Sequence, residues 1–288
     1  GALGVCAAFE VARAVDAPVA VIAFADEEGA RFNTPTFGSR ALAGRLDVDD
    51  VLARRDDDGV LLRDAMASAG VDPDGLRRAP EWLPRLRGFL ELHVDQTPDL
   101  DSYGVVRALA SRVRVQADLD GRADHSGTTR RGERRDAMLA AARLIVAADE
   151  AAGEDMVATA SRLLVEPNAL TTIASHVRLW LDARAADPAV LDRWLETLRA
   201  QAGAARLTVA SRSDGTEFDP DVRRALGDPG GVLCFAGHDA GILAERIPAG
   251  MVLTRNPSGI SHSPEEEADL YAAAAGAQAM VRALGALA

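Results

Sequence analysis

Three consecutive carboxylates, Asp26, Glu27 and Glu28, follow an apolar run in the stretch VIAFADEEGARF at residues 21–32. A single acid there would need no special role, because any polar turn can end a strand. Two adjacent glutamates at the end of a buried strand must stay hydrated, pair with cations or share a proton. The pair is therefore a candidate for a metal ligand next to a base.

Only five histidines occur in the chain, and two of them stand where metal ligands are often found. His93 lies in GFLELHVDQ, where strand alternation puts it between two carboxylates on one face. His262 lies in GISHSPEEEA, in a loop at the end of a domain. Catalytic zinc takes two or three such ligands plus water, and an adjacent glutamate often moves the proton. Glu28, His93 and His262 are thus candidate ligands, and Glu27 is a candidate base.

Each of these positions also has a purely structural explanation. The polar face of the His93 strand can simply face solvent. The segment 263–266 reads as a capping box that starts a helix at 264. Of the other histidines, His238 is explained by the start of a helix and His176 by ordinary strand surface. His125 lies among small hydroxyl residues in RADHSGTT, at a turn.

The spacing of apolar residues predicts an α/β domain from two separate parts of the chain, 1–102 and 215–288. The elements expected in the first part are a helix at 3–15, a buried strand at 18–25, short helices at 38–46 and 58–69, and a strand at 88–96. Those expected in the second part are a helix in 237–247, a strand at 249–254 and a terminal helix from 264.

A separate α+β domain is predicted over 103–214, inserted between these two parts. Its elements follow the order β-α-β-β-α-β, with helices at 134–152 and 188–202, which is the ferredoxin-like order. The first residues of the chain already read as an amphipathic helix. A domain seldom begins inside a helix, so we expect the chain to be the remainder of something longer.

Composition excludes several classes of function. The 288 residues carry a net charge of −12 and contain no lysine, and no basic stripe suited to nucleic acid is present. No apolar run approaches the roughly 18 residues of a membrane helix, and no signal peptide opens the chain. Two cysteines far apart in sequence, Cys6 and Cys234, favour a reducing cytoplasm over a disulfide framework.

Five co-linear stretches, which cover nearly the whole chain, resemble one family. They are FADEEGARFNTPTFGSRALAG, ELHVDQTPDL, ADHSGTTRRGERRDAMLAAA, VEPNALTTIASHVRLWLDAR and AGHDAGILAERIPAGMVL followed by GISHSPEE. The family is that of the zinc amidohydrolases that include N-carbamoyl-L-amino acid hydrolases, ureidopropionases and allantoate amidohydrolases. It belongs to the aminoacylase/carboxypeptidase superfamily of metallopeptidases.

The resemblance implies a metallopeptidase-like α/β catalytic domain with an inserted lid and dimerisation domain. It implies a homodimer that binds two divalent metal ions (Zn²⁺, or Mn²⁺ or Co²⁺) and a small substrate with a carboxylate. It also assigns roles to seven residues, namely the base Glu27, the metal ligands Glu28, His93 and His262, the carbonyl-polarising His125, and Gln96 and Arg184 on the substrate carboxylate.

Several positions depart from the family pattern. Thr171 stands where a second substrate-binding asparagine is usual, Asp95 replaces a glutamate, Thr97 a glycine and Arg130 a proline. The family's GSHxDT strand end and the bridging aspartate would fall before Gly1. We therefore expect three of five metal ligands and weakened metal binding.

The function predicted by the resemblance is hydrolysis of the ureido group of an N-carbamoyl-L-amino acid to the amino acid, ammonia and carbon dioxide. Allantoate, an N-acyl amino acid or a small peptide are alternative substrates. An alternative of another class is a non-catalytic dimeric binding protein descended from such an enzyme. The missing ligands favour this alternative, whereas the retained Glu27, Glu28, His93 and His262 speak against it.

Overall fold

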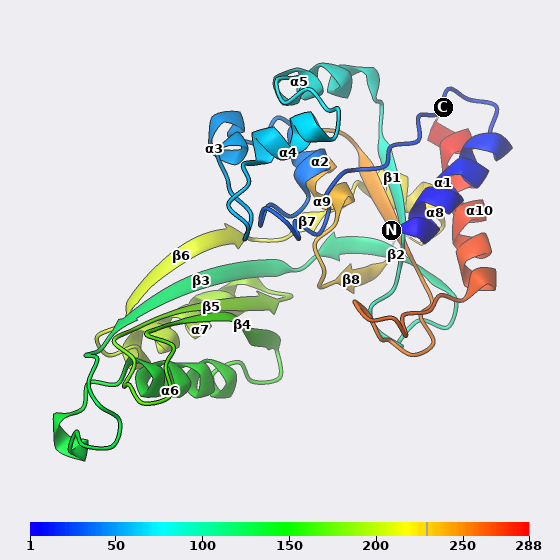
Figure 1. The fold of residues 1–288 in the computed structure, drawn as a ribbon. Coiled ribbons are helices and arrows are strands. Elements are labelled where there is room, and N and C mark those ends of the chain that lie inside the picture. The colour runs from blue at the N-terminus through cyan, green and yellow to red at the C-terminus, as the bar shows by residue number, and fades with distance from the viewer. Residues whose placement is uncertain (229, 288) are drawn as a thin grey trace. The chain divides into compact units, whose positions relative to one another are not determined.

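A computed structural model describes residues 1–228 and 230–287 of the chain. The chain forms two compact units (Figure 1). Unit 1 contains Gly1–Leu109 and the chain from Thr216 onward, and unit 2 contains Ala110–Gly215. Each unit has its own sheet and its own hydrophobic core.

In the sheet of unit 1, the buried strand β9 (Ala249–Thr254) lies between two other strands. The strand order is β1 (Phe89–Val94), β9 (Ala249–Thr254), β2 (Tyr103–Leu109) and β7 (Thr216–Glu217), and β8 (Val232–Cys234) also pairs with β2. β1 and β9 are parallel, whereas β2 is antiparallel to β9. Every residue of β9 is buried, as expected when helices cover both faces of a strand.

Helices lie on both faces of this sheet (Figure 1). On one face, α1 (Ala2–Ala14), α8 (Pro220–Leu226) and α10 (Leu270–Leu287) pack with Leu92 and Val252. On the other face, α9 (Asp239–Leu243) packs against the side chains that alternate with these, such as Leu253, and α2 (Phe37–Leu42) contacts α9. This arrangement confirms the predicted α/β fold class.

A small helical segment precedes β1 in unit 1. It consists of α3 (Val48–Leu52), α4 (Leu62–Ser68), α5 (Gly75–Arg78) and a 3₁₀ helix (Ala79–Arg85). Phe32, Phe37, Val51 and Leu62 form a separate apolar cluster beneath it. In the ranges that the structure describes, no helix is long and apolar enough to cross a membrane.

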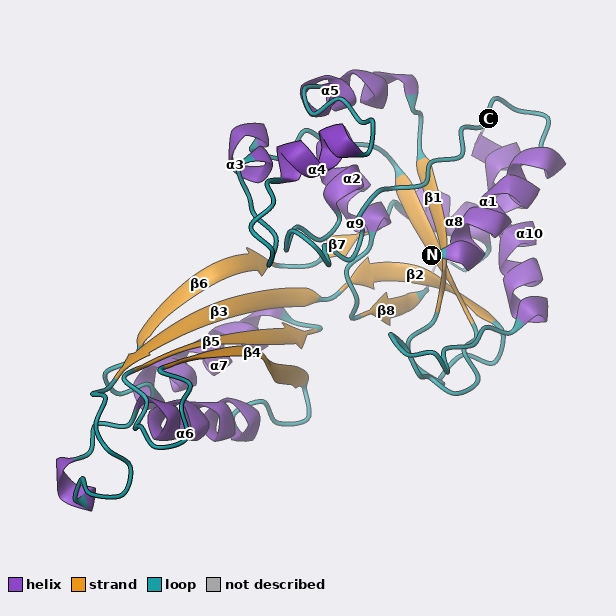
Figure 2. Ribbon diagram, in the orientation of Figure 1, coloured by secondary structure: helices purple, strands orange, loops and turns teal. Residues whose placement is uncertain are grey.

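Unit 2 has the predicted β-α-β-β-α-β order (Figure 2). Its elements are β3 (Ser111–Asp120), α6 (Ala137–Glu150), β4 (Met156–Glu166), β5 (His176–Ala185), α7 (Pro188–Gln201) and β6 (Arg206–Ser213). The sheet order is β4-β5-β3-β6 and all its pairs are antiparallel. This is the ferredoxin-like topology.

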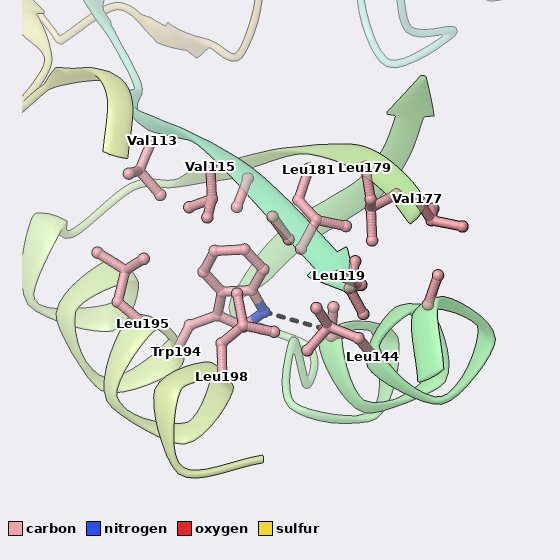
Figure 3. Close-up of a cluster of buried hydrophobic side chains, with 14 of the residues drawn as sticks. Val113, Val115, Leu119, Leu144, Val177, Leu179, Leu181, Trp194, Leu195 and Leu198 are labelled. Carbon is pink, nitrogen blue, oxygen red and sulfur yellow. Dashed lines mark hydrogen bonds between the residues drawn. The ribbon is translucent and has the colours of Figure 1, made fainter. Parts of the chain in front are cut away.

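The core of unit 2 lies between the sheet and its two helices (Figure 3). Trp194 of α7 is 1% exposed, and its indole Nε1 donates a hydrogen bond to the Ala148 carbonyl of α6 at 2.9 Å. The burial of this large ring therefore leaves no unsatisfied polar atom. Asp136 and Asp187 accept backbone hydrogen bonds at the starts of α6 and α7.

One predicted element is wrong, and the predicted start of another is wrong. The segment 18–25 is not a strand, and much of it is exposed, because apolar character alone supplies no neighbouring strand for its backbone groups. The terminal helix begins at Leu270 rather than at 264. Glu266 does not close a capping box there, since its carboxylate accepts the backbone N–H of His262, and Asp269 caps the helix through the N–H groups of Tyr271 and Ala272.

Candidate active site

The carboxyl ends of β1 and β9 form the edge of unit 1 where the predicted site residues lie. Val94 lies opposite Thr254 in this parallel pair, so the chain leaves both strands at the same edge. His93 is next to the last residue of β1, and His262 follows β9. Ligands of α/β sheets commonly bind at such an edge.

Glu28 and His262 are in direct contact. The Nε2 atom of His262 lies 3.1 Å from Oε1 of Glu28, and the two side chains are 66% and 63% exposed. The φ angle of His262 is 56°, which is uncommon for a residue other than glycine. The carboxylate of Glu266 holds this backbone, accepting the His262 N–H and the Ser261 hydroxyl, both at 3.0 Å. Such strained positions persist where contacts enforce them, and they cluster at functional sites.

Glu27 is half-buried beside this pair. Burial raises the pKa of Glu27, and the charge of Glu28 raises it further, whereas His238 and His262 act in the opposite direction. Its own carbonyl accepts a hydrogen bond from the Thr36 N–H at 2.6 Å, which fixes the turn. A carboxylate with a raised pKa is a better proton acceptor near neutral pH, so Glu27 is suited to act as a base.

His238, which the sequence reading assigned to the start of a helix, also belongs to this edge. It occupies the N-cap position of α9 but makes no side-chain capping bond. Its Nδ1 lies 3.3 Å from Oε1 of Glu91, and its ring centroid lies 4.6 Å from that of His93. The other oxygen of Glu91 accepts the Ala240 N–H at 2.7 Å. The polar face of β1 is therefore turned toward α9 and not toward solvent.

The charge state of His238 follows from these contacts. Burial lowers the pKa of His238, but the contacts with Cys234 and Glu91 outweigh it and raise the pKa to about 10. The imidazolium is thus the stable form beside the Glu91 carboxylate. Among the residues that the structure describes, no hydrogen-bond partner is found for its buried Nε2. The sequence signal that could have pointed to a charged His238 was Glu91, a carboxylate within the strand β1 that requires a cationic partner.

The carboxylate of Glu28 and the imidazoles of His93 and His262 are of the ligand types that a divalent cation such as Zn²⁺ binds. Two ligand atoms bound at about 2.1 Å to one ion lie about 3.0–3.4 Å apart, which matches the contact of Glu28 with His262. Nδ1 of His93 lies 2.7 Å from the Val94 carbonyl, which leaves Nε2 as its ligating nitrogen. Among the residues described, however, no three His, Cys, Asp or Glu side chains are grouped to hold one ion. The structure joins Glu28 to His262 but does not add His93 as a third member.

Gln96 lies in a turn that its neighbours build. The carboxylate of Asp95, which is 6% exposed, accepts the Gln96 N–H and the Thr97 hydroxyl, both at 2.8 Å. Two of the departures noted in the sequence, at 95 and 97, therefore bind one another. Asp95 is shorter than the usual glutamate, and it accepts a hydrogen bond from the hydroxyl of Thr97, which stands where glycine is usual.

In unit 2, His125 and Thr171 lie next to each other. An isolated bridge pairs His125 with Thr172, and the Ser126 N–H donates to the Thr171 carbonyl at 2.9 Å. Nδ1 of His125 accepts the Gly127 N–H at 3.1 Å, so a neutral ring carries its proton on Nε2. Because His125 is exposed, this Nε2–H can donate to the carbonyl of a ligand.

Arg184 lies next to the last residue of β5, at the end of the strand away from Thr171. Its Nε donates to Asp182 at 2.8 Å, and Asp182 also accepts from Arg114 at 2.7 Å. Burial raises the pKa of Asp182, but the hydrogen bonds from Arg184 and Arg114 outweigh it and hold the pKa below its usual range. The strand between His176 and Arg184 spans about 26 Å at about 3.3 Å per residue. Thr171 precedes His176, so one small substrate cannot touch both Thr171 and Arg184 in a single copy.

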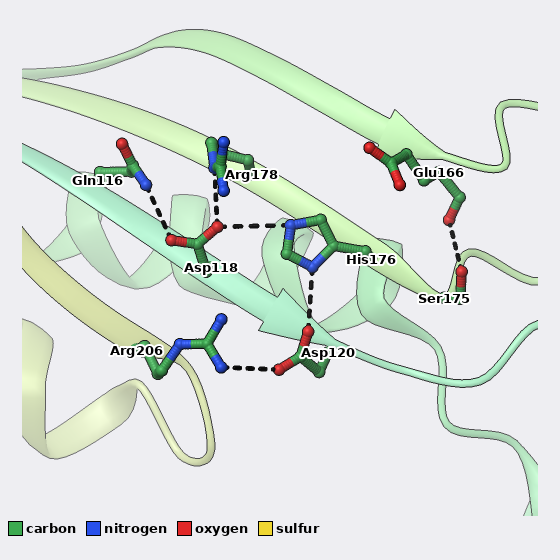
Figure 4. A network of polar contacts seen from close by, with 8 residues as sticks. All are labelled: Gln116, Asp118, Asp120, Glu166, Ser175, His176, Arg178 and Arg206. Atoms are coloured by element: carbon green, nitrogen blue, oxygen red, sulfur yellow. Dashed lines mark hydrogen bonds and ion pairs between the residues drawn. The ribbon is translucent and has the colours of Figure 1, made fainter.

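His176 forms part of a polar network on the exposed sheet face of unit 2 (Figure 4). Its Nδ1 lies 3.0 Å from Asp120 and its Nε2 lies 3.4 Å from Asp118. Arg178 and Arg206 pair with the same two carboxylates. The prediction of a strand-surface position is confirmed, and the network is a structural set of cross-strand ion pairs.

A family model described as peptidase family M20/M25/M40 matches residues 1–286. The N-carbamoyl-L-amino acid amidohydrolase of Geobacillus stearothermophilus is 33% identical, over 97% of this chain and 75% of its own length. The allantoate amidohydrolase of Escherichia coli K12 is 31% identical, over 91% of this chain and 69% of its own. The crystal structure of a hydantoinase/carbamoylase family amidase from Burkholderia vietnamiensis superposes with a TM-score of 0.86 at 28% identity, covering 100% of this chain and 76% of that one.

Proposed function

Because the chain belongs to peptidase family M20/M25/M40, with amidohydrolases among its relatives, we propose that it hydrolyses a linear C–N bond, namely the ureido bond of an N-carbamoyl-L-amino acid. The resemblance seen in the sequence is confirmed by these matches. The observation that carries the proposal is the contact of Glu28 with His262 beside Glu27, whose pKa is raised, at the carboxyl edge of the sheet. Allantoate is the nearest alternative substrate, because similarity to an allantoate amidohydrolase is almost as high.

Glu27 takes a proton from the water that attacks the ureido carbonyl carbon. The C–N bond to the amino acid then breaks, and the proton held by Glu27 passes to the leaving nitrogen. The products are the amino acid and carbamate, which decays to ammonia and carbon dioxide. The raised pKa of Glu27 brings its basicity closer to that needed for both transfers.

Glu28, His93 and His262 would hold divalent metal, which this family uses for hydrolysis and which we propose to be two ions of Zn²⁺, Mn²⁺ or Co²⁺. The bound metal would polarise the carbonyl oxygen and lower the pKa of water. His238, buried beside Glu91 with its ring centroid 4.6 Å from that of His93, would place a positive charge at the same edge. His93 is fixed by its Nδ1 contact with the Val94 carbonyl.

His125, Gln96, Thr171 and Arg184 would bind the substrate. His125 would donate its Nε2–H to the developing oxyanion. Arg184, with its planar fork, is suited to the substrate carboxylate, and its partner Asp182 orients the guanidinium. Because β5 separates Arg184 from Thr171, binding by both would require residues from two copies of the chain.

A homodimer through unit 2 would supply these two copies. α6 exposes Met138, Leu139 and Val146, and the edge strand β4 exposes Val157, Leu163 and Leu164. Such apolar side chains on a helix and on a strand edge are suited to pairing with a second copy. Light scattering should give the mass of a dimer at micromolar protein, and Val146→Glu should lower it to that of a monomer. A wild-type monomer would exclude this arrangement. We also propose a cytoplasmic location, in keeping with the free thiols of Cys6 and Cys234.

The proposed activity is tested by measuring ammonia and amino acid release from N-carbamoyl-L-amino acids, allantoate and N-acetyl-L-amino acids, with Zn²⁺, Mn²⁺ or Co²⁺ supplied. We expect the N-carbamoyl compounds to be hydrolysed fastest, and Glu27→Gln to abolish most of the rate. Faster release from allantoate would move the assignment to that substrate. Tight binding of these compounds without hydrolysis would instead indicate the non-catalytic binding protein.

A further inference from the structure

Asn256 lies two residues beyond β9 and is completely buried. Its side-chain amide donates to the carbonyls of Asp95 at 3.0 Å and Ile260 at 2.8 Å. Its Oδ1 accepts the Ser258 N–H at 3.2 Å, the Ser258 hydroxyl at 3.0 Å and the Gly259 N–H at 3.1 Å. Both donors and the acceptor of one amide are therefore satisfied in the interior of unit 1.

These hydrogen bonds join the two segments that carry site residues. Asp95 lies between His93 and Gln96 at the end of β1, whereas Ile260 lies two residues before His262. The two segments also pack closely, because a Cβ atom on Gly259, where φ is +68°, would lie 2.7 Å from Cδ of Pro98. A movement of the 256–260 loop relative to the end of β1 would thus also displace the chain that leads to His262.

The partners of these hydrogen bonds distinguish a positioning role from the ordinary role of an asparagine in a turn. An asparagine that only builds a turn uses its side-chain oxygen on the N–H groups that follow it, as Asn256 does with Ser258 and Gly259. The turn itself does not require the bond from the amide N–H to Asp95, which is distant in sequence. That bond ties the loop to β1.

We propose that Asn256 is a positioning residue, which holds the His262 loop in register with the end of β1 so that His262 meets Glu28. The proposal rests on the proposed function for its effect on catalysis. Its structural content, the placement of the His262 ring, is independent of which substrate is hydrolysed.

Asn256→Asp is the decisive variant, because it keeps the shape and the accepting oxygen but replaces both donors. The new oxygen would face the carbonyls of Asp95 and Ile260, which can only accept. We expect kcat/KM to fall by about tenfold to a hundredfold, since two buried hydrogen bonds are lost. Ser258→Ala is the matched control. It removes a hydroxyl that donates to Asn256 and accepts the exposed Ile260 N–H at 3.2 Å, but it leaves both amide donors in place, and it should change kcat/KM by less than about threefold.

The second readout is the ring of His262 itself. Long-range ¹H–¹⁵N spectra report on imidazole rings, of which this chain has five, and comparison with a His262→Gln variant would assign the signals of His262. Asn256→Asp should shift the His262 signals and leave those of His125 and His176, both in unit 2, unchanged. A role limited to general stability would not move the His262 ring in a protein that remains folded.

Unchanged His262 signals, or kcat/KM within about threefold of wild type, would overturn the proposal. If Asn256→Asp does not fold, Gly259→Ala tests the same coupling, because the added methyl group pushes the loop from Pro98 while the amide donors remain. It should shift His262 in the same way, and no shift would again refute the positioning role. If the wild-type protein hydrolyses none of the substrates, the proposed function fails, and the His262 spectra alone decide the role of Asn256.

Discussion

Replacement of Glu27 by glutamine separates proton transfer from stability at the candidate active site. Glutamine has nearly the same shape but cannot take up the proton of the attacking water. General base catalysis contributes about 10²–10⁴-fold, so kcat should fall by that factor, which corresponds to about 3–5 kcal/mol of transition-state free energy. KM should change little, because Glu27 is not assigned to substrate binding.

The effect on stability should have the opposite sign. Burial and the neighbouring Glu28 raise the pKa of Glu27 in the folded protein, so folding becomes less favourable as the pH rises through that pKa. At pH 7, Glu27→Gln removes a half-buried charge that lies beside another carboxylate. The melting temperature should therefore be equal to or higher than that of the wild type. The difference should vanish below about pH 4, where the carboxyl is neutral in both states.

The assay measures amino acid release from an N-carbamoyl-L-amino acid at several pH values, together with thermal unfolding of the same samples. Glu10→Gln is the control, because it neutralises an exposed glutamate of α1 that forms an exposed pair with Arg13. It should leave both the rate and the melting temperature nearly unchanged. A Glu27→Gln protein that keeps more than about a tenth of the rate would refute the role of base. A clear loss of melting temperature would refute the electrostatic reasoning.

Three further outcomes follow from the contacts described. Arg184→Ala should lower kcat/KM for carboxylate substrates by an amount that corresponds to about 2–4 kcal/mol, because a charged bidentate contact is lost. The loss should be largely absent with substrates that lack the carboxylate, and Arg114 still pairs with Asp182 in this variant. Asp182→Asn should lower stability above about pH 4 and make the loss of stability on acidification smaller than in the wild type. The folded pKa of Asp182 is held low, and its stabilisation is lost as the pH falls through that pKa; urea denaturation from pH 2 to 7 measures this. His262→Ala should weaken Zn²⁺ binding at least about tenfold in calorimetric titration, whereas an unchanged affinity would show that His262 is not a ligand.

The local patterns of the sequence were sufficient for most elements and for unit 2 as a whole. In β5, residues 177–184 alternate in the sequence, and the structure buries Leu179, Leu181 and Ala183 in the core and leaves Asp182 and Arg184 on the other face. Strand alternation and helix periodicity are properties of neighbouring residues, so they can be read without the fold. The carboxylate pair at 27 and 28 was visible for the same reason.

Other features depended on partners that are distant in sequence. The apolar run at 18–25 has the composition of a strand, but strand formation requires another backbone, and composition does not reveal whether one is present. The terminal helix begins at Leu270 because Glu266 is taken by the His262 loop.

The position and charge of His238 were likewise decided by tertiary structure, through a glutamate on β1. The same holds for the contact of Glu28 with His262 and for the amide bonds of Asn256. The sequence by itself determined which side chains were available for chemistry and which elements would carry them. Only the tertiary structure decided which of these side chains meet, because hydrogen bonds, burial and the resulting pKa shifts arise between segments that the fold brings together.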